Sequence, residues 1–292
     1  MRLPGRIIIL AVFINCLWGA NPVAVKFGLE VFPPLWSGFV RFTVAFVVLL
    51  LWGKWHGLPI WPHRHEWLPL ALLSAFFAAQ VALMNVGFGM TSGSMGAVLL
   101  ALNPLFAAGF AHFLLAGDRM SRVKFAGLVV AFTGAAVVLS PHDVDGVREF
   151  TNPGNWIVLL SCIMLGARLV FSAKLLRSVD EVRVTLWMVC FSIPLFGISG
   201  AATETIHWSA LGWAPVLGLL YQAIVITCFC FMVNFYLIKH YPPSVMMSFS
   251  FVSPIAGVLT SAWLLDEGVT WSLWAGLVLV AAGLVLIARR PC

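Results

Sequence analysis

Runs of about 20 mostly apolar residues recur from one end of the chain to the other, and this feature constrains the fold most. As an α-helix, such a run is long enough to cross the hydrocarbon core of a bilayer. Only 10% of the residues are charged, against about 25% in soluble domains. The runs are continuous and do not alternate with polar residues, which argues against a transmembrane β-barrel. We therefore expect an all-α integral membrane protein.

Ten such runs can be separated by their polar turns, which predicts ten transmembrane helices. They cover about 7–27, 34–53, 67–90, 95–116, a fifth run ending at 140, and then 156–176, 184–202, 213–238, 243–265 and 271–288.

The second half of the chain repeats a series of proline, acidic and glycine residues that occurs in the first half. The series Pro104, Asp118, Gly127 and Gly134 returns at an offset of about 149 residues, as Pro254, Glu267, Gly276 and Gly283. A polar stretch from 142 to 155 separates the two halves. We predict two five-helix repeats, residues 1–147 and 148–292, that together form one membrane domain.

The distribution of basic residues predicts the orientation. With the N-terminus in the cytoplasm, the inner segments hold thirteen Lys and Arg residues, whereas the outer segments hold only Lys26 and Arg148. Cytoplasmic segments of membrane proteins carry such an excess, so both termini are expected in the cytoplasm. An odd number of helices in each repeat then inserts the two halves in opposite directions. Inverted repeats are typical of transporters whose binding site lies at the membrane midplane.

Specific residues resemble those of a known family. The first run contains Leu17-Trp-Gly-Ala-Asn-Pro-Val-Ala-Val-Lys26, the second contains Arg41-Phe42, and both halves have the Pro, acid, Gly, Gly series. In these features the chain resembles the EamA-type branch of the drug/metabolite transporter superfamily over nearly its whole length. The resemblance implies export or exchange of small metabolites across a bacterial inner membrane, with amino acids, aromatic or hydrophobic ones included, as the expected substrates. A multidrug or cation exporter of the same superfamily is the alternative.

One position departs from the family pattern. The turn after the fourth run usually carries Glu, whereas this chain has Asp118; the second half keeps Glu267. The shorter side chain puts in doubt any bond that this residue makes to a facing helix end.

Arg168 is the strongest candidate for a substrate contact. It lies near the middle of the sixth run, where exposure of a charge to lipid costs about 3 kcal/mol or more. Its guanidinium is suited to bind a substrate carboxylate. A structural bond to helix carbonyls, or an extension of the side chain toward the interface, remains an equal alternative. For Arg41 we favour a structural role.

Other intramembrane polar and aromatic residues complete the predicted site. The full set of predicted substrate-binding residues is Asn15, Trp18, Asn21, Gln80, Asn85, Asn103, Arg168, Tyr221 and Gln222. Pro22, Pro104 and Pro254 each remove a backbone hydrogen bond within a run. They are predicted to kink or break the helices and to mark the moving parts.

We find no motif of an enzyme. The acidic residues lie only near the ends of the runs and in loops, and no metal-ligand series, phosphate loop or nucleophile motif is present. We expect no catalytic residues, no metal and no cofactor, and as partners a small solute and the bilayer but no nucleic acid. A membrane-embedded lipid-modifying enzyme or a receptor scaffold are the competing classes. Small residues at Gly127–Ala131 and Gly276 predict close helix packing within a monomer or, alternatively, a homodimer contact.

Overall fold

The structure is a computed structural model that describes residues 4–114, 122–139, 151–241 and 248–288. Within these ranges the chain is helical and contains no strand. The elements are α1 (Gly5–Leu29), α2 (Pro34–Trp55), α3 (Trp67–Met90), α4 (Gly93–Leu100), α5 (Asn103–Leu114), α6 (Arg122–Leu139), α7 (Pro153–Leu175), α8 (Glu181–Thr203), η2 (Trp208–Ala210), α9 (Trp213–Leu220), η3 (Tyr221–Cys230), α10 (Phe231–His240), η4 (Ser248–Phe251), α12 (Val252–Leu264) and α13 (Trp271–Ala288).

Six helical segments are long and apolar enough to cross a membrane: α1, α2, α3, α7, α8 and the continuous segment Trp213–His240. Four shorter apolar helical segments occupy the remaining predicted runs: Gly93–Ala107, Val129–Val138, Val252–Leu264 and Trp271–Leu286. Helical backbone satisfies its own hydrogen bonds, which lipid cannot do. The expectation of an all-α membrane protein is confirmed for the described residues, while the count of ten crossings stays a prediction.

Two of the predicted runs are not uniform α-helices. The fourth is divided at Ala101–Leu102 into α4 and α5, and Pro104 lies in the first turn of α5, where proline is tolerated. The eighth is continuous, but its centre, η3, is a π-helix. The hydroxyl of Thr227 donates to the carbonyl of Gln222, five residues earlier, at 2.8 Å. π-Helical turns are rare and occur mostly as single-turn bulges within α-helices, frequently at functional sites.

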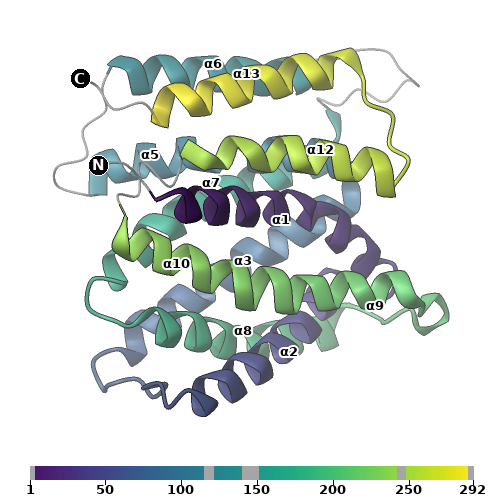
Figure 1. Cartoon of the computed structure of the whole chain (residues 1–292). Helices are drawn as coiled ribbons and strands as arrows, with labels where there is room; N and C mark the ends of the chain where they lie inside the picture. The colour runs from purple at the N-terminus through teal and green to yellow at the C-terminus, as the bar shows by residue number, and fades with distance from the viewer. Residues whose placement is uncertain (1–3, 115–121, 140–150, 242–247, 289–292) are drawn as a thin grey trace.

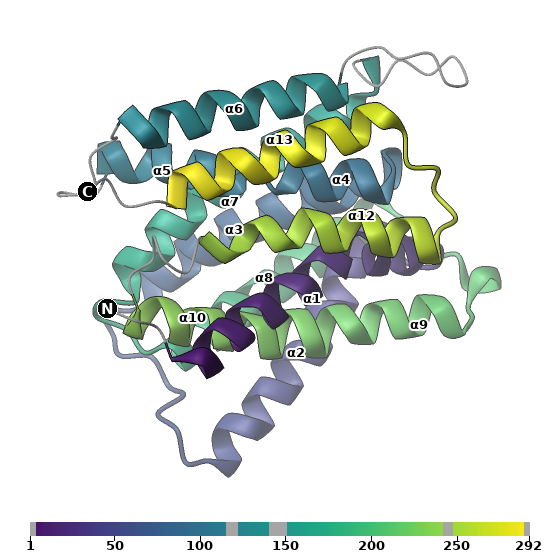
Figure 2. The ribbon, with the colours of Figure 1, turned by 45° about the horizontal axis from the view of Figure 1, so that its top comes forward.

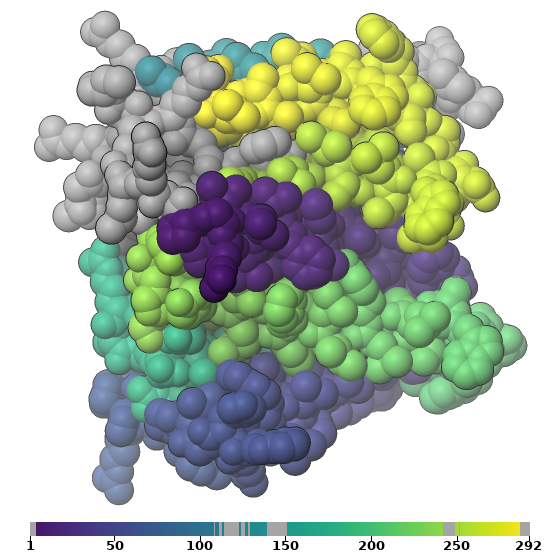
Figure 3. All heavy atoms as spheres, in the orientation of Figure 1, coloured from purple at the N-terminus to yellow at the C-terminus, as the bar shows by residue number. Residues whose placement is uncertain are grey.

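The helices stack with their long axes in broadly similar directions (Figure 1). The pair α6 and α13 lies at one side of the stack and the pair α2 and α8 at the other. Helix α1 lies between them, packed against α12 on one side and α9 on the other, and the space-filling view shows it at the centre of one face (Figure 3). Helix α1 begins, and α13 ends, at the same end of the bundle (Figure 2).

Glycines allow the closest helix contacts. A Cβ on Gly283 of α13 would lie 2.5 Å from the carbonyl oxygen of Gly127 and 2.6 Å from Cβ of Ala131, both on α6. One on Gly276 would lie 2.8 Å from the carbonyl oxygen of Gly134. Small residues of this kind let helix backbones approach in membranes. The predicted small faces therefore pack against each other within one chain.

Candidate functional site

Arg168 of α7 lies in the interior of the bundle, with only 4% of its surface exposed. Its guanidinium carbon is 4.9 Å from the ring centre of Phe77 on α3 and 6.0 Å from that of Phe231 on α10. The ring of Trp18, on α1, is 6.3 Å from that of Phe231. Faces of aromatic rings attract a cation, which helps to hold the charge of Arg168 away from water. We call Arg168, Phe77, Phe231 and the nearby Met188 the Arg168 site.

The donors of Arg168 are poorly paired. Nη1 lies 3.8 Å from the sulfur of Met188, and a thioether is a weak acceptor. Nε is buried and has no hydrogen-bond partner among the described residues. The ion pairs of the described chain involve Lys26, Arg183 and Lys239, and none includes Arg168. Neither a carbonyl nor a carboxylate of the described residues accepts from this side chain.

Arg41 is a second buried guanidinium, on α2, with 2% of its surface exposed. Its Nε donates to the hydroxyl of Thr227 at 3.2 Å and its Nη1 to the side-chain oxygen of Gln222 at 3.3 Å. Its guanidinium carbon is 4.8 Å from the ring centre of Phe42. Arg41 thus binds neutral oxygens of the π-helix η3, and this contact joins α2 to η3.

Five of the predicted site residues, Asn85 and four others, donate hydrogen bonds to neighbouring groups. The bonds of these four others run from Asn15 Nδ2 to the Ala11 carbonyl (2.8 Å), from Gln80 Nε2 to Ser161 Oγ (3.0 Å), from the Tyr221 hydroxyl to the Leu17 carbonyl (2.7 Å) and from Gln222 Nε2 to the Ala24 carbonyl (2.9 Å). The last two join η3 to α1 on either side of Pro22, the proline inside that helix. Side chains of η3 therefore support the segment of α1 in which proline removes a backbone bond.

Three predicted asparagines keep a buried oxygen without a partner among the described residues: Asn21, Asn85 and Asn103. The amide nitrogen of Asn85 donates to the carbonyl of Pro34 at 3.0 Å, which places it at the start of α2. Asn103 opens α5, which packs against α7. Pro254, like Pro104, lies in the first turn of its helix, so among the three prolines only Pro22 lies deep inside a helix of the described chain.

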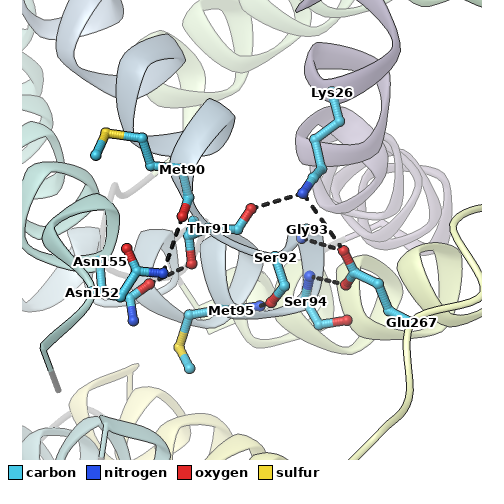
Figure 4. Close-up of polar contacts among 10 residues, drawn as sticks. All are labelled: Lys26, Met90, Thr91, Ser92, Gly93, Ser94, Met95, Asn152, Asn155 and Glu267. Atoms are coloured by element: carbon cyan, nitrogen blue, oxygen red, sulfur yellow. Dashed lines mark hydrogen bonds and ion pairs between the residues drawn. The ribbon is translucent and has the colours of Figure 1, made fainter. Parts of the chain in front are cut away.

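A polar network around Glu267, whose partners the sequence did not predict, lies at one end of the bundle (Figure 4). The carboxylate of Glu267 accepts from the backbone N–H groups of Gly93 and Ser94, at 2.6 and 2.8 Å, at the N-terminus of α4. Nζ of Lys26 lies 3.9 Å from the same carboxylate and donates to the Thr91 carbonyl at 2.7 Å. We call these five residues the Glu267 network. A carboxylate at a helix N-terminus satisfies free N–H groups and interacts favourably with the helix dipole.

The same end of the bundle also connects α3 to α7. Asn152, the N-cap of α7, donates to the carbonyl of Met90 at 3.0 Å, and Thr91 hydrogen-bonds to Asn155 (Figure 4). Thr91 thus belongs to both sets of contacts. These contacts hold together the ends of α1, α3, α4 and α7 and the α12–α13 connection. The counterpart of Glu267 in the first half, Asp118, lies outside the described residues.

Charged groups also join helix ends at the other end of the bundle. Lys239, at the end of α10, pairs with Asp180 at 3.8 Å and with Glu181 at the start of α8. Arg183 of α8 pairs at 3.3 Å with Glu66, which precedes α3. These pairs tie the start of α8 to α10 and α3.

The described residues contain no cluster of His, Cys, Asp and Glu that could hold a metal ion. Acidic side chains in these ranges lie at helix ends or in connections, as at Glu66, Asp180, Glu204 and Glu267. The interior therefore offers guanidinium, amide and hydroxyl groups between aromatic and aliphatic walls. In binding sites of known proteins, a few polar groups among apolar walls fix the orientation of a small ligand.

Comparison with known proteins identifies the family. The model of the EamA-like transporter family matches the chain twice, over residues 5–140 and 152–289. The chain belongs to the EamA-like transporter family. It is therefore a multi-pass membrane transporter rather than an enzyme, as the sequence predicted.

Individual relatives agree with this assignment. The EamA-like chain is 26% identical to the uncharacterized transporter YvbV of Bacillus subtilis, over 98% of this chain and 92% of the relative. It is 24% identical to the uncharacterized inner membrane transporter YedA of Escherichia coli K12, over 93% of this chain and 87% of the relative. A solved crystal structure matches with a TM-score of 0.73 and 16% identity, covering 97% of this chain and 96% of that one. This last likeness concerns the fold alone.

Proposed function

We propose that this EamA-like protein exports or exchanges small metabolites that carry a carboxylate, such as amino acids and their relatives, and that Arg168 binds the carboxylate. One observation carries the proposal: a guanidinium that is 4% exposed has an unpartnered Nε and no acidic partner among the described residues. A buried charge without a partner is costly. A carboxylate would accept from the planar fork of the guanidinium with strong, charge-assisted hydrogen bonds.

The proposed architecture is ten crossings in two inverted repeats, 1–147 and 148–292. Two separate family matches support it, as does the helix packing. Helix α3 of the first half packs on α7 of the second, and the equivalent contact is that of α9 and η3 with α1. Helix α12 of the second half packs on α1 of the first, and the equivalent contact is that of α4 and α5 with α7. The pairs α6 with α13 and α2 with α8 each join equivalent positions of the two halves. Exchanging the two halves therefore turns each of these named contacts into another of them or into itself, as a two-fold axis between the halves would do.

For the location we propose a bacterial inner membrane with both termini in the cytoplasm. The excess of basic residues in the predicted inner segments supports this orientation, and the E. coli relative named above is an inner membrane transporter. In this orientation the Glu267 network lies at the outer end of the bundle, and the pairs of Lys239 and Arg183 lie at the inner end.

Transport then requires alternating access to the Arg168 site. Solute enters from the inner end, pairs with Arg168, and leaves when contacts such as the Glu267 network open at the outer end. Helix α1 is suited to bend at Pro22, which interrupts its hydrogen bonding, while the bonds from η3 hold the helix on both sides of that residue.

The charge of the interior bears on the alternative of a cation exporter. Arg41 and Arg168 are both buried, and their side chains are linked by the contact of Phe42 with Phe77, whose ring centres are 5.0 Å apart. Two buried guanidiniums repel a cationic solute, so the geometry favours carboxylates. Because the sequence places no acid in the middle of a predicted crossing, facilitated export or exchange is a better fit than obligate coupling to protons.

Efflux from proteoliposomes tests the proposal. Vesicles containing the purified protein are loaded with labelled amino acids and simple carboxylates, with and without a pH gradient. We expect efflux above that of protein-free vesicles, and a loss of at least tenfold for Arg168→Ala. Lys54→Ala, which removes a charge from the exposed end of α2, is the matched control. Efflux that equals the protein-free rate for every solute would refute the proposal.

A further inference from the structure

The Arg168 site has an excess of positive charge that a zwitterion cannot neutralise. Among the described residues, Arg168 contacts two aromatic rings and a thioether, and its Nε has no acceptor. Arg41, the other buried cation of the described residues, has only neutral oxygens as hydrogen-bond partners. Bringing a carboxylate to this region offsets one of two unpaired charges.

An α-ammonium group of a ligand would find few favourable interactions next to Arg168. The described side chains around Arg168 provide no carboxylate to receive it, and the ring faces of Phe77 and Phe231 already lie next to a guanidinium. Neutral amide oxygens accept hydrogen bonds from an ammonium, but they do not offset its repulsion from two guanidiniums. The ammonium would therefore lose its hydration without an opposite charge in exchange.

From this balance we infer that the site prefers net-anionic organic acids with an apolar or aromatic body over the corresponding zwitterionic amino acids. Deaminated or N-acylated relatives of amino acids have this chemistry. The aromatic rings of Phe77, Phe231 and Trp18 suit the body of the ligand, and the unpartnered Nε group of Arg168 suits its carboxylate. The inference rests on the proposed role of Arg168 and narrows its substrate class.

A series of three ligands with one skeleton tests the inference. Binding of 3-phenylpropionate, phenylalanine and phenethylamine to the detergent-solubilised full chain is measured by calorimetry at pH 7. These ligands share a phenylethyl group and are an anion, a zwitterion and a cation. We expect 3-phenylpropionate to bind at least tenfold more tightly than phenylalanine, with no saturable binding of phenethylamine. Equal or tighter binding of phenylalanine, or no saturable binding of 3-phenylpropionate, overturns the inference.

Variants separate a direct contact from a structural effect. Arg168→Met should reduce the preference for the anion over the zwitterion toward onefold, whereas Arg168→Lys should keep part of it, and Lys54→Met should leave it unchanged. An equal loss of affinity for both ligands in Arg168→Met would indicate a structural role and contradict the inference. If Arg168→Met does not fold, the ligand series on the wild-type chain decides alone.

The two proposals fail independently. Transport of phenylalanine without preferential binding of 3-phenylpropionate would remove this inference and leave the proposed function intact. Binding of 3-phenylpropionate with no movement of any tested solute would remove the proposed function and leave the anion site.

Discussion

At the scale of single residues, Glu267 shows what the sequence reveals and what it leaves open. Its place in the repeated series marked it as a notable position, and the family resemblance suggested a bond to a facing helix end. The structure supplies the partners, which are the backbone of Gly93 and Ser94 and the side chain of Lys26. Nothing in the sequence links positions so far apart, because these contacts depend on how the helices pack.

Replacing Glu267 by Ala should destabilise the protein by about 1–2 kcal/mol, because two N–H groups at the start of α4 lose their acceptor and the favourable charge near the helix dipole. Gln should cost less, since it keeps one acceptor oxygen. The measurement is unfolding of the purified protein in detergent. Asp266→Asn, a change at the exposed neighbouring position, is the control. Stability of Glu267→Ala equal to that of the control would show that the network contributes nothing.

At the scale of helices, hydropathy predicted where the helices lie along the chain, but not where a helix is divided or which type of helix forms. The predicted run 67–90 coincides with α3, and 271–288 coincides with α13. Run length alone did not reveal the division between α4 and α5, nor the π-helix inside 213–238. Arg41 of α2 bonds to Gln222 and Thr227 of this π-helix, a contact between helices that hydropathy cannot predict.

We predict that an added methyl group at Gly283 destabilises the contact between α6 and α13. Its Cβ would lie 2.5 Å from the Gly127 carbonyl, so the two backbones must separate, which costs about 1–3 kcal/mol. Thermal unfolding of Gly283→Ala in detergent should show this loss. Gly268→Ala, where nothing lies within 4 Å of the added carbon, should behave as wild type. Equal midpoints for the two variants would mean that α6 and α13 do not pack as described.

The candidate site was predictable as a list of residues but not as a set of partners. Arg168 stood out because a charge inside an apolar run needs an explanation. That its neighbours would be Phe77, Phe231 and Met188, rather than an acid, required the packing of α3, α10 and α8 around α7. Likewise, Tyr221 and Gln222 had the right chemistry for a solute, yet both hydrogen-bond to carbonyls of α1.

At the scale of the whole molecule, the proposed arrangement of five crossings in each repeat makes a prediction about topology. Fluorescent protein fused after the last residue should fluoresce, because it remains in the cytoplasm, whereas alkaline phosphatase inserted after Gly146 should be active, because that connection lies outside. Activity of alkaline phosphatase at the C-terminus would contradict the proposed arrangement. Fluorescence of a fluorescent protein inserted after Gly146 would also contradict the proposed arrangement.

The most direct test of the central claim is the concentration dependence of carboxylate uptake into proteoliposomes. We predict that the wild-type rate saturates, that Arg168→Lys raises the half-saturating concentration by at least tenfold, and that Arg168→Ala reduces uptake to the protein-free level although the variant unfolds like the wild type. These changes follow if Arg168 holds the carboxylate with a bidentate guanidinium that lysine cannot reproduce. Saturable uptake with the same half-saturating concentration in all three proteins would show that the solute never meets Arg168.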